Sequence, residues 1–135
     1  NLHALVQTLS VFQKIKLART GNKEARALLI RETNKIVASA VVRSPKITDQ
    51  EVLGFAKSRN VSDEVLRLIS ANRDWTKSYQ MKLALAGNPK CPQPVAIRFL
   101  NYLHEKDLHG LVKSRDVPSS ISTHARRLLA KKGKI

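Results

Sequence analysis

The sequence predicts an all-α protein, a stack of about nine or ten short antiparallel helices, and two observations predict this fold class. The first is an internal repeat, because residues 57–61 (KSRNV) recur 56 positions later as residues 113–117 (KSRDV). Residues 44–48 (SPKIT) and 88–92 (NPKCP) form a second pair, 44 positions apart. The second observation is that apolar residues recur at helical spacing in short segments, without convincing β alternation. Repeats spaced by several tens of residues are typical of stacked helical arrays.

Ten helical segments are expected, each with an apolar stripe at helical spacing between capping or breaking residues. Because the loops between them are short, consecutive helices should lie roughly antiparallel, and neighbours in sequence should cover each stripe. The segments span about residues 2–9, 11–20, 23–32, 35–43, 48–57, 63–70, 75–86, 96–103, 108–113 and 118–130.

Capping residues mark several helix starts. The patterns S-x-x-Q over residues 10–13 and T-x-x-E over residues 48–51 are capping boxes, in which two side chains satisfy the first free backbone N–H groups of a helix. Asn60 or Ser62 is expected to start the helix that follows the first KSR segment. Asp74 is expected to cap a single helix that carries the aromatic residues of the middle of the chain.

Glycine and proline mark the helix ends. Gly21 is expected to adopt the left-handed conformation that ends a helix, with Asn22 ready to cap the next one. Pro45 prevents the helix before it from continuing, and the turn over residues 87–89 ends a later helix in the same way. Gly54, in contrast, lies inside a helix, where it costs up to about 1 kcal/mol relative to alanine unless another backbone packs closely there.

Length and composition predict one domain of strongly positive charge. We expect a helical-repeat domain over residues 1–130 and a basic tail over residues 131–135. With 25 Lys and Arg against 10 Asp and Glu, the net charge of +15 favours nucleic acid, an anionic membrane surface or an acidic protein patch as the partner. The single cysteine, Cys91, excludes an internal disulfide and is compatible with a reducing compartment. Since no apolar run reaches the roughly 18 to 20 residues of a membrane span and no secretory signal pattern is present, we expect a cytoplasmic protein. We also expect it to be a monomer.

One stretch of the sequence resembles a known family. The pattern K-I-K-L-A-x-x-G-N-K-E-A-R covers Lys14 to Arg26, and Asn-Pro and Ser-Pro breaks separate the short amphipathic helices. These features resemble the HEAT and armadillo-like superfamily, and the chain from Lys14 to Leu129 is similar to a family of small uncharacterised bacterial helical-repeat proteins. The resemblance implies a HEAT-like right-handed stack, an α-solenoid. It implies no established activity, so no functional residue is carried over.

Metal binding and catalysis are not expected. The four histidines have neither i, i+3 nor i, i+4 spacing, so the sequence predicts no metal site and no cofactor. Asp74 lies beside Trp75 and one helical turn from Tyr79, and these residue types resemble the acid and aromatics of HEAT-like alkylpurine DNA glycosylases. An N-capping aspartate and two core aromatics account for the same residues, so we predict that the protein is not an enzyme.

The two KSR segments are the strongest functional signal. Equivalent positions of a stacked repeat recur on the same edge, so Lys57, Arg59, Lys113 and Arg115 are predicted to form a row that meets a polyanion. Alternatively, these cations offset the dipoles at helix C-termini and the serines make loop hydrogen bonds. Both interpretations can hold together, because a cation beside a helix end stays available to a phosphate.

The C-terminal segment adds a second set of cations with no acid between residues 126 and 135. The candidate anion-binding residues there are Arg126, Arg127, Lys131 and Lys132. With the KSR segments they predict a non-enzymatic binding module whose basic face engages the phosphate backbone of nucleic acid. The alternative is a protein–protein interaction scaffold that binds an acidic partner surface, because six aromatic residues in the whole chain leave little for base stacking.

Overall fold

The computed structural model describes residues 1–134, and within that range the regular structure is entirely helical, which confirms the all-α class. Within these residues no helix has both the length and the apolar character needed to cross a membrane. The helices are α1 (Leu2–Gln7), α2 (Val11–Thr20), α3 (Lys23–Leu29), α4 (Lys35–Val42), α5 (Asp49–Lys57), α6 (Asp63–Ala71), α7 (Arg73–Thr76), α8 (Tyr79–Gly87), α9 (Gln93–Leu100), α10 (Glu105–Lys113) and α11 (Ser119–Lys131).

The eleven helices of the described residues exceed the predicted nine or ten because the segment expected as one helix over residues 75–86 is two. Asn72, not Asp74, caps α7, and its side-chain oxygen accepts a hydrogen bond from the Trp75 N–H at 3.1 Å. Ser78 then adopts an extended conformation and caps α8. The prediction that Asp74 is the N-cap is therefore wrong, because an equally good capping residue lies two positions earlier and a second one interrupts the helix.

Both predicted capping boxes are present. The Ser10 hydroxyl accepts a hydrogen bond from the Gln13 N–H at 3.1 Å, and the Gln13 side chain accepts one from the Ser10 N–H at 2.9 Å. Thr48 and Glu51 make the equivalent bonds at 3.2 and 3.0 Å. Ser62, and not Asn60, caps α6. Local hydrogen bonds therefore determine where these three helices begin.

Gly21 follows the last residue of α2, but its conformation differs from the predicted one. Its φ is −75° and its ψ is 176°, which is extended and not left-handed. A Cβ atom at this position would lie 2.6 Å from the Leu17 carbonyl oxygen and 2.9 Å from the Ala25 Cβ. Glycine is therefore required by the close approach of α2 and α3, because any side chain would collide there.

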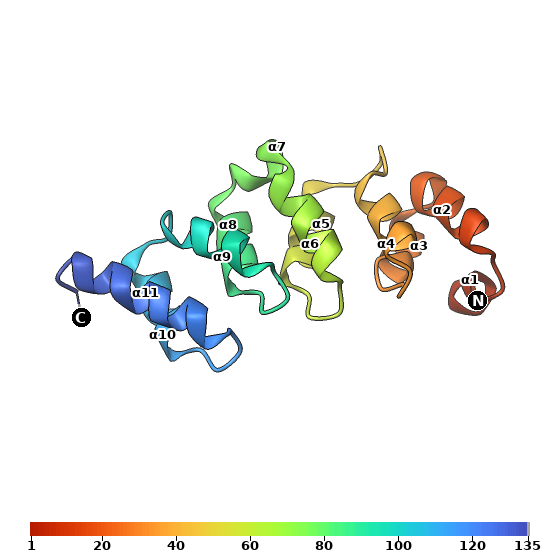
Figure 1. Ribbon diagram of the computed structural model, residues 1–135. Helices are drawn as coiled ribbons and strands as arrows, with labels where there is room; N and C mark the ends of the chain where they lie inside the picture. The colour runs from red at the N-terminus through yellow and green to blue at the C-terminus, as the bar shows by residue number, and fades with distance from the viewer. Residues whose placement is uncertain (135) are drawn as a thin grey trace.

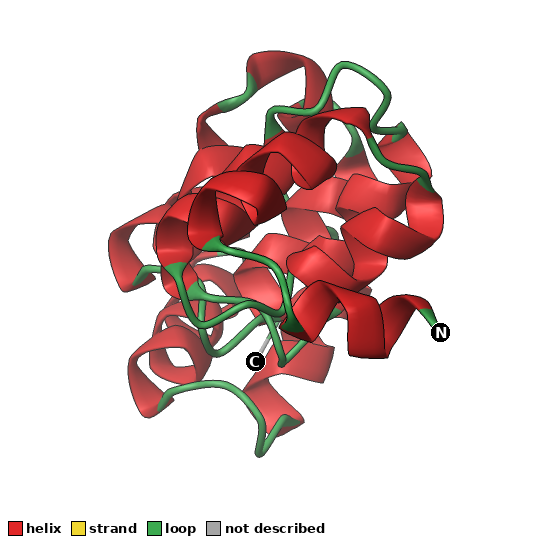
Figure 2. Cartoon of the chain, turned by 90° about the vertical axis from the view of Figure 1, so that its right-hand side faces the viewer, coloured by secondary structure: helices red, strands yellow, loops and turns green. Residues whose placement is uncertain are grey.

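Each helix packs mainly against helices near it in sequence. Helix α2 packs against α4, α4 against α6, α5 against α8, α8 against α9, and both α9 and α10 against α11. The molecule is consequently elongated, with its two termini at opposite ends (Figure 1). Seen from the N-terminal end, it consists of helices joined by short loops (Figure 2). A single hydrophobic core runs along this stack, and its largest fully buried side chains are Leu29, Leu66, Ile69, Leu85, Leu100, Leu108, Ile121 and Leu129.

The end of α11 replaces most of the predicted basic tail. Lys131 is still helical, and Gly133 has a positive φ of 69°. The N–H groups of Gly133 and Lys134 donate to carbonyl oxygens three and five residues earlier, at 3.0 and 2.9 Å. This is a Schellman motif, which closes a helix by satisfying its last carbonyls. Residues 131–134 therefore belong to the helix and its cap, while Ile135 of the predicted tail lies outside the described residues.

Candidate functional site

The two KSR segments have the same local structure. Lys57 and Lys113 end α5 and α10, and the serine that follows each of them is an extended C-cap, with φ and ψ of −78° and 141° in Ser58 and −69° and 135° in Ser114. Each serine hydroxyl accepts a hydrogen bond from the N–H two residues later, at 3.0 and 3.1 Å. The sequence repeat is therefore also a structural repeat, in which the serines make loop hydrogen bonds.

An ion pair joins the two segments. The Arg59 Nε donates to Oδ2 of Asp116 at 2.8 Å, and its Nη2 donates to the same oxygen. Asp116 occupies the position in the second segment that Asn60 occupies in the first, so the one position at which the two five-residue segments differ supplies the carboxylate. The ion pair thus joins the two copies of the five-residue repeat, which are 56 positions apart in sequence.

The turn after α8 completes this surface. Asn88 is buried, and its side-chain nitrogen donates to the carbonyl oxygens of Ala56 and Ser58, both at 2.8 Å. Its side-chain oxygen accepts a hydrogen bond from the Lys90 N–H at 3.0 Å. The turn after α8 is therefore bonded to the end of α5, and Arg59 adds a hydrogen bond to the Gly87 carbonyl oxygen at 3.3 Å.

Ser44, which corresponds to Asn88 in the second repeated pair, plays the same part at the end of α4. It is buried, and its hydroxyl accepts a hydrogen bond from the Lys46 N–H at 3.2 Å. The same hydroxyl donates to the Arg19 carbonyl oxygen at 3.3 Å, near the end of α2. Both members of this pair therefore tie a turn to the end of a helix that lies earlier in the chain.

We call residues 57–61, 87–92 and 113–117 together the loop edge, because these three turns lie along the lower edge of the molecule in Figure 1. Four of its cations are exposed and have no acidic partner among the described residues. They are Lys57, Lys90, Lys113 and Arg115. Sequence reasoning did not include Lys90, although the recurrence of Pro-Lys in the second repeated pair was a signal for it.

Arg59 is less available than the other predicted residues of the loop edge. Besides its ion pair with Asp116, its guanidinium group donates to the Lys57 carbonyl oxygen at 2.9 Å and to that of Gly87 at 3.3 Å. The Arg59 side chain is still 44% exposed. Its charge is therefore offset by Asp116, and its hydrogen-bond donors serve the loop edge itself.

The predicted residues of α11 form a separate group. Arg126, Arg127, Lys131 and Lys132 are all exposed and have no acidic partner among residues 1–134. Helix α11 starts beside the loop edge at Ser119 and has 13 residues. At 1.5 Å per residue, its last turn lies about 20 Å from the loop edge. Lys131 and Lys132 thus lie at the end of α11 far from the loop edge, whereas Arg126 and Arg127 lie in the middle of the helix.

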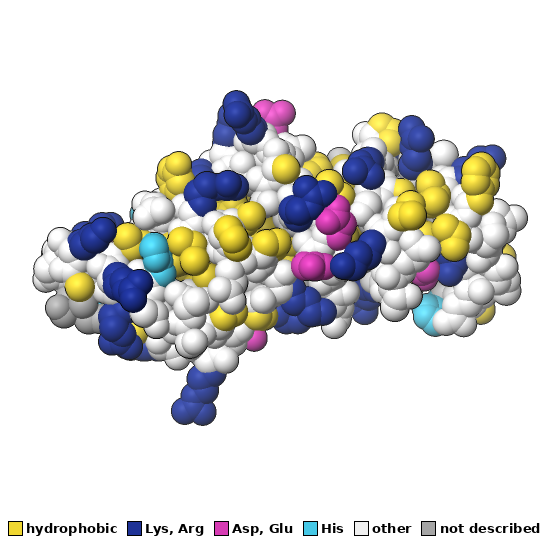
Figure 3. All heavy atoms as spheres, viewed as in Figure 1, with side chains coloured by type: hydrophobic (Ala, Val, Ile, Leu, Met, Phe, Trp, Pro, Cys, Tyr) yellow, Lys and Arg dark blue, Asp and Glu magenta, His cyan; other side chains and the backbone are white. Residues whose placement is uncertain are grey.

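The positive charge is not confined to these clusters. Six ion pairs within the described residues engage six of the 25 Lys and Arg and six of the 10 Asp and Glu, which leaves 19 cations without an acidic partner there. On the face shown in Figure 3, Lys and Arg side chains are spread along the whole length of the molecule, and acidic side chains are few. An anion approaching this face therefore meets a positive field along the whole stack.

The residues compared with a glycosylase site do not converge. Asp74 is highly exposed on α7 and pairs with Lys77 at 3.6 Å. Trp75 is half-buried on the same short helix, whereas Tyr79 begins α8. The Tyr79 hydroxyl donates to Asp107 and accepts a hydrogen bond from the backbone N–H that starts α10 at 3.0 Å. Burial, followed by the hydrogen bond to Asp107, raises the pKa of Tyr79, and the two hydrogen bonds of its hydroxyl join α8 to α10.

The single thiol and the possible metal ligands are also candidate reactive groups. Cys91 is buried, and burial raises the pKa of its thiol to about 11, so the thiolate is not populated at neutral pH. Among residues 1–134, no group of three or more His, Cys, Asp or Glu side chains is placed to hold a metal ion.

Comparison of the chain with known protein families, with curated proteins and with solved structures finds no match.

Proposed function

We propose that this protein is a non-enzymatic binding module that holds the phosphate backbone of nucleic acid along its loop edge and the end of α11. The observation that carries the proposal is the gathering of four unpaired cations on one edge from three turns far apart in sequence. We further propose that the helices form a HEAT-like right-handed α-solenoid, which is supported by packing between near neighbours and by the repeated KSR structure.

The chemistry of the loop edge favours contacts to phosphate over contacts to bases. Residues 57–61, 87–92 and 113–117 contain no aromatic side chain, so this surface offers no platform on which bases could stack. Lysine and arginine bind phosphates through charge, and each neutralised phosphate releases counterions. Such contacts position a nucleic acid without reading its sequence. Binding should therefore depend weakly on sequence and steeply on salt.

We expect affinity for duplex DNA to fall on the order of a thousandfold between 50 and 200 mM salt if about six phosphates are engaged. Fluorescence anisotropy with labelled duplex and single strands measures this. Removing the four free cations of the loop edge should flatten the salt slope by about one unit per lost contact. The loop-edge variant combines Lys57→Ala, Lys90→Ala, Lys113→Ala and Arg115→Ala.

A matched control removes the same charge elsewhere. Its four positions are exposed and unpaired within residues 1–134 and lie outside the loop edge. The control variant combines Lys16→Ala, Arg43→Ala, Arg73→Ala and Lys106→Ala. It should retain most of the affinity and the salt slope. Equal losses in the two variants would refute a localised site, and absence of binding at 50 mM salt would favour the acidic protein partner.

Replacing Asp116 with asparagine should strengthen binding. This change makes the second five-residue KSR segment identical to the first. It also removes the only acid of the loop edge, so the charge of Arg59 is no longer offset. One more available cation should steepen the salt slope by about one unit. The same anisotropy titration measures it, with circular dichroism to verify the fold. An unchanged or weaker affinity in the folded variant would show that Arg59 and Asp116 lie outside the phosphate path.

A further inference from the structure

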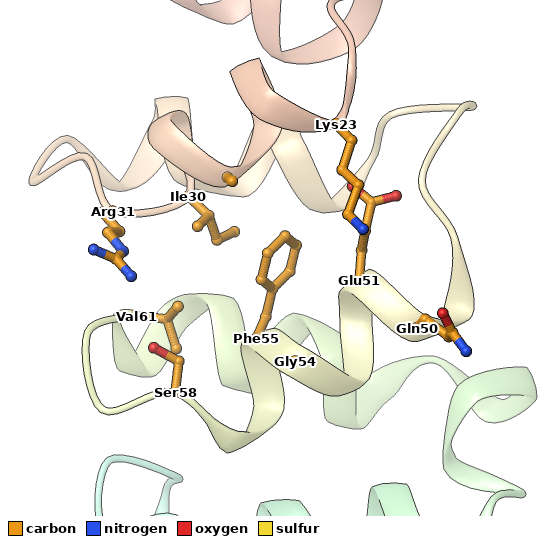
Figure 4. A pocket seen from close by; sticks show the side chains of 10 residues that line it. Lys23, Ile30, Arg31, Gln50, Glu51, Gly54, Phe55, Ser58 and Val61 are labelled. Atoms are coloured by element: carbon orange, nitrogen blue, oxygen red, sulfur yellow. The ribbon is translucent and has the colours of Figure 1, made fainter. Parts of the chain in front are cut away.

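An open groove runs between α3 and α5, and two residues of the loop edge, Ser58 and Val61, line one part of it (Figure 4). Its volume is about 350 Å³, which is within the range of ligand-binding clefts. In Figure 4 the side chains of Ile30 and Phe55 face each other across its middle, and Lys23 and Arg31 lie toward its two ends. Its lining residues include Lys23, Ala27, Ile30, Arg31, Gly54 and Phe55.

Gly54 is the least expected residue of this groove. It lies inside α5, is exposed, and has no positive φ. A Cβ atom at this position would meet nothing within 4 Å, so no turn and no packing in the described residues requires glycine. Glycine inside a helix lowers its stability relative to alanine. Gly110 in α10 shares these features, so the glycine alone does not indicate a partner, but at Gly54 the bare helix surface faces the groove and leaves room for a backbone to approach α5.

The charges at the groove select for an acidic occupant. Lys23 and Arg31 have no acidic partner among residues 1–134. Glu51 is the one acid among the described lining residues, and it is buried in an ion pair with Arg26. Because Lys23 starts α3 and Arg31 follows its end, the two cations are separated by eight residues, or roughly 12 Å along the axis.

The occupant must also satisfy its own backbone. The groove walls are helices whose N–H and C=O groups bond within the helices, and the middle of the groove is apolar. An extended peptide placed there would leave backbone groups without partners, which is costly. A helix carries its hydrogen bonds internally and can lay an apolar face into such a groove. An apolar middle between two cations therefore matches an amphipathic helix with acidic residues near both ends.

We propose that this groove binds an acidic amphipathic helix of a partner protein. An apolar side chain of that helix packs over Ile30 and Phe55, which form the floor of the groove and are 3% and 9% exposed, and its backbone passes close to Gly54. Two acidic side chains, seven or eight residues apart, pair with Lys23 and Arg31. The groove borders the loop edge at Ser58 and Val61, but its occupant differs from the phosphate backbone proposed there. Lys23, Arg31 and Gly54, the groove residues that the experiments change, lie outside the loop edge.

A display library of helical peptides provides the probe. Wild-type protein is the bait, and the Gly54→Trp variant, whose indole fills the groove, is used for counter-selection. Enriched peptides should carry two acids seven or eight residues apart around an apolar residue. Enrichment of no sequence, or of sequences without this acid pair, would overturn the inference.

Replacing each of two glycines with alanine separates an effect on peptide binding from an effect on stability. Gly54→Ala should raise the melting temperature by a few degrees, because alanine favours the helix, and yet weaken the selected peptide at least tenfold. Gly110→Ala is the matched control, since Gly110 is also exposed inside a helix with nothing within 4 Å of a Cβ. It should raise the melting temperature similarly and leave peptide binding unchanged. Equal peptide affinity in both variants would contradict a close approach at Gly54.

Charge reversal tests the two ends of the groove. Lys23→Glu combined with Arg31→Glu should weaken the selected peptide at least tenfold, and a peptide with lysine in place of its two acids should recover binding to this variant. Failure of that recovery would contradict the proposed pairing. Gly54→Trp should leave DNA affinity unchanged, so a failure of the groove inference is distinguishable from a failure of the proposed phosphate binding.

Discussion

Replacing Glu51 with glutamine should lower the free energy of unfolding by about 3 to 5 kcal/mol, because it leaves the buried charge of Arg26 without its partner. The two side chains are 6% and 3% exposed, and the Arg26 Nε lies 2.7 Å from the Glu51 Oε1. A second bond from Nη2 to Oε2 at 3.2 Å makes the pair bidentate. Glutamine can retain the capping bond from the Thr48 N–H through its one oxygen, but its NH2 group then faces the Arg26 Nε–H, so the substitution removes the charge and a hydrogen bond together.

Denaturant unfolding followed by circular dichroism measures this change. The control is the double variant Arg26→Met with Glu51→Gln, in which no buried charge is left unpaired. It should recover part of the lost stability, because methionine removes the unpaired charge and leaves an uncharged pair at this site. Equal stability of wild type and the Glu51→Gln variant would show that water reaches Arg26 and satisfies its charge.

The same pair predicts how stability depends on pH. The hydrogen bond from Arg26 is the largest cause that lowers the pKa of Glu51 from its ordinary value of 4.5. Because this pKa is lowered in the folded protein, the pair contributes its full stability at pH values above the ordinary carboxyl pKa. The contribution is lost as the pH falls through the pKa that Glu51 has in the folded protein. Acidification below pH 4.5 should therefore reduce the unfolding free energy more in the wild type than in the Glu51→Gln variant.

Replacing Leu100 with alanine should cost about 2 to 5 kcal/mol, the range for removing a fully buried leucine and leaving a cavity. Leu100 has no exposed surface, ends α9, and belongs to the continuous core with Ala96 and Leu103. Helix α9 packs against both α8 and α11, so the cavity would open between three helices. The denaturant midpoint of the variant measures the loss.

A control variant tests whether burial is the cause. Ile36→Ala also removes a large aliphatic side chain, but Ile36 is 66% exposed. Surface substitutions of this kind usually change stability by no more than about 0.5 kcal/mol. A Leu100→Ala midpoint as close to the wild type as that of Ile36→Ala would contradict the placement of Leu100 in the core.

The sequence by itself determined the helical class and most helix boundaries. Caps and breaks act within about four residues, so their outcome is written into local sequence. The capping boxes at Ser10 and Thr48 formed as predicted, and Ser58 and Ser114 repeat one local structure. Where several capping residues stood close together, as between Asn72 and Ser78, sequence alone did not decide among them.

Only the tertiary structure decided which charges are free and which apolar residues are covered. Glu51 reads from the sequence as a capping residue, and Arg59 reads as a cation beside a helix end. The fold brings their partners from 25 and 57 residues away, so Glu51 is buried in an ion pair and the Arg59 charge is offset. In the same way, Ile36 is exposed beside buried Val37 because an almost wholly apolar helix does not specify its buried face. Such outcomes depend on contacts between segments distant in sequence, which local patterns do not contain.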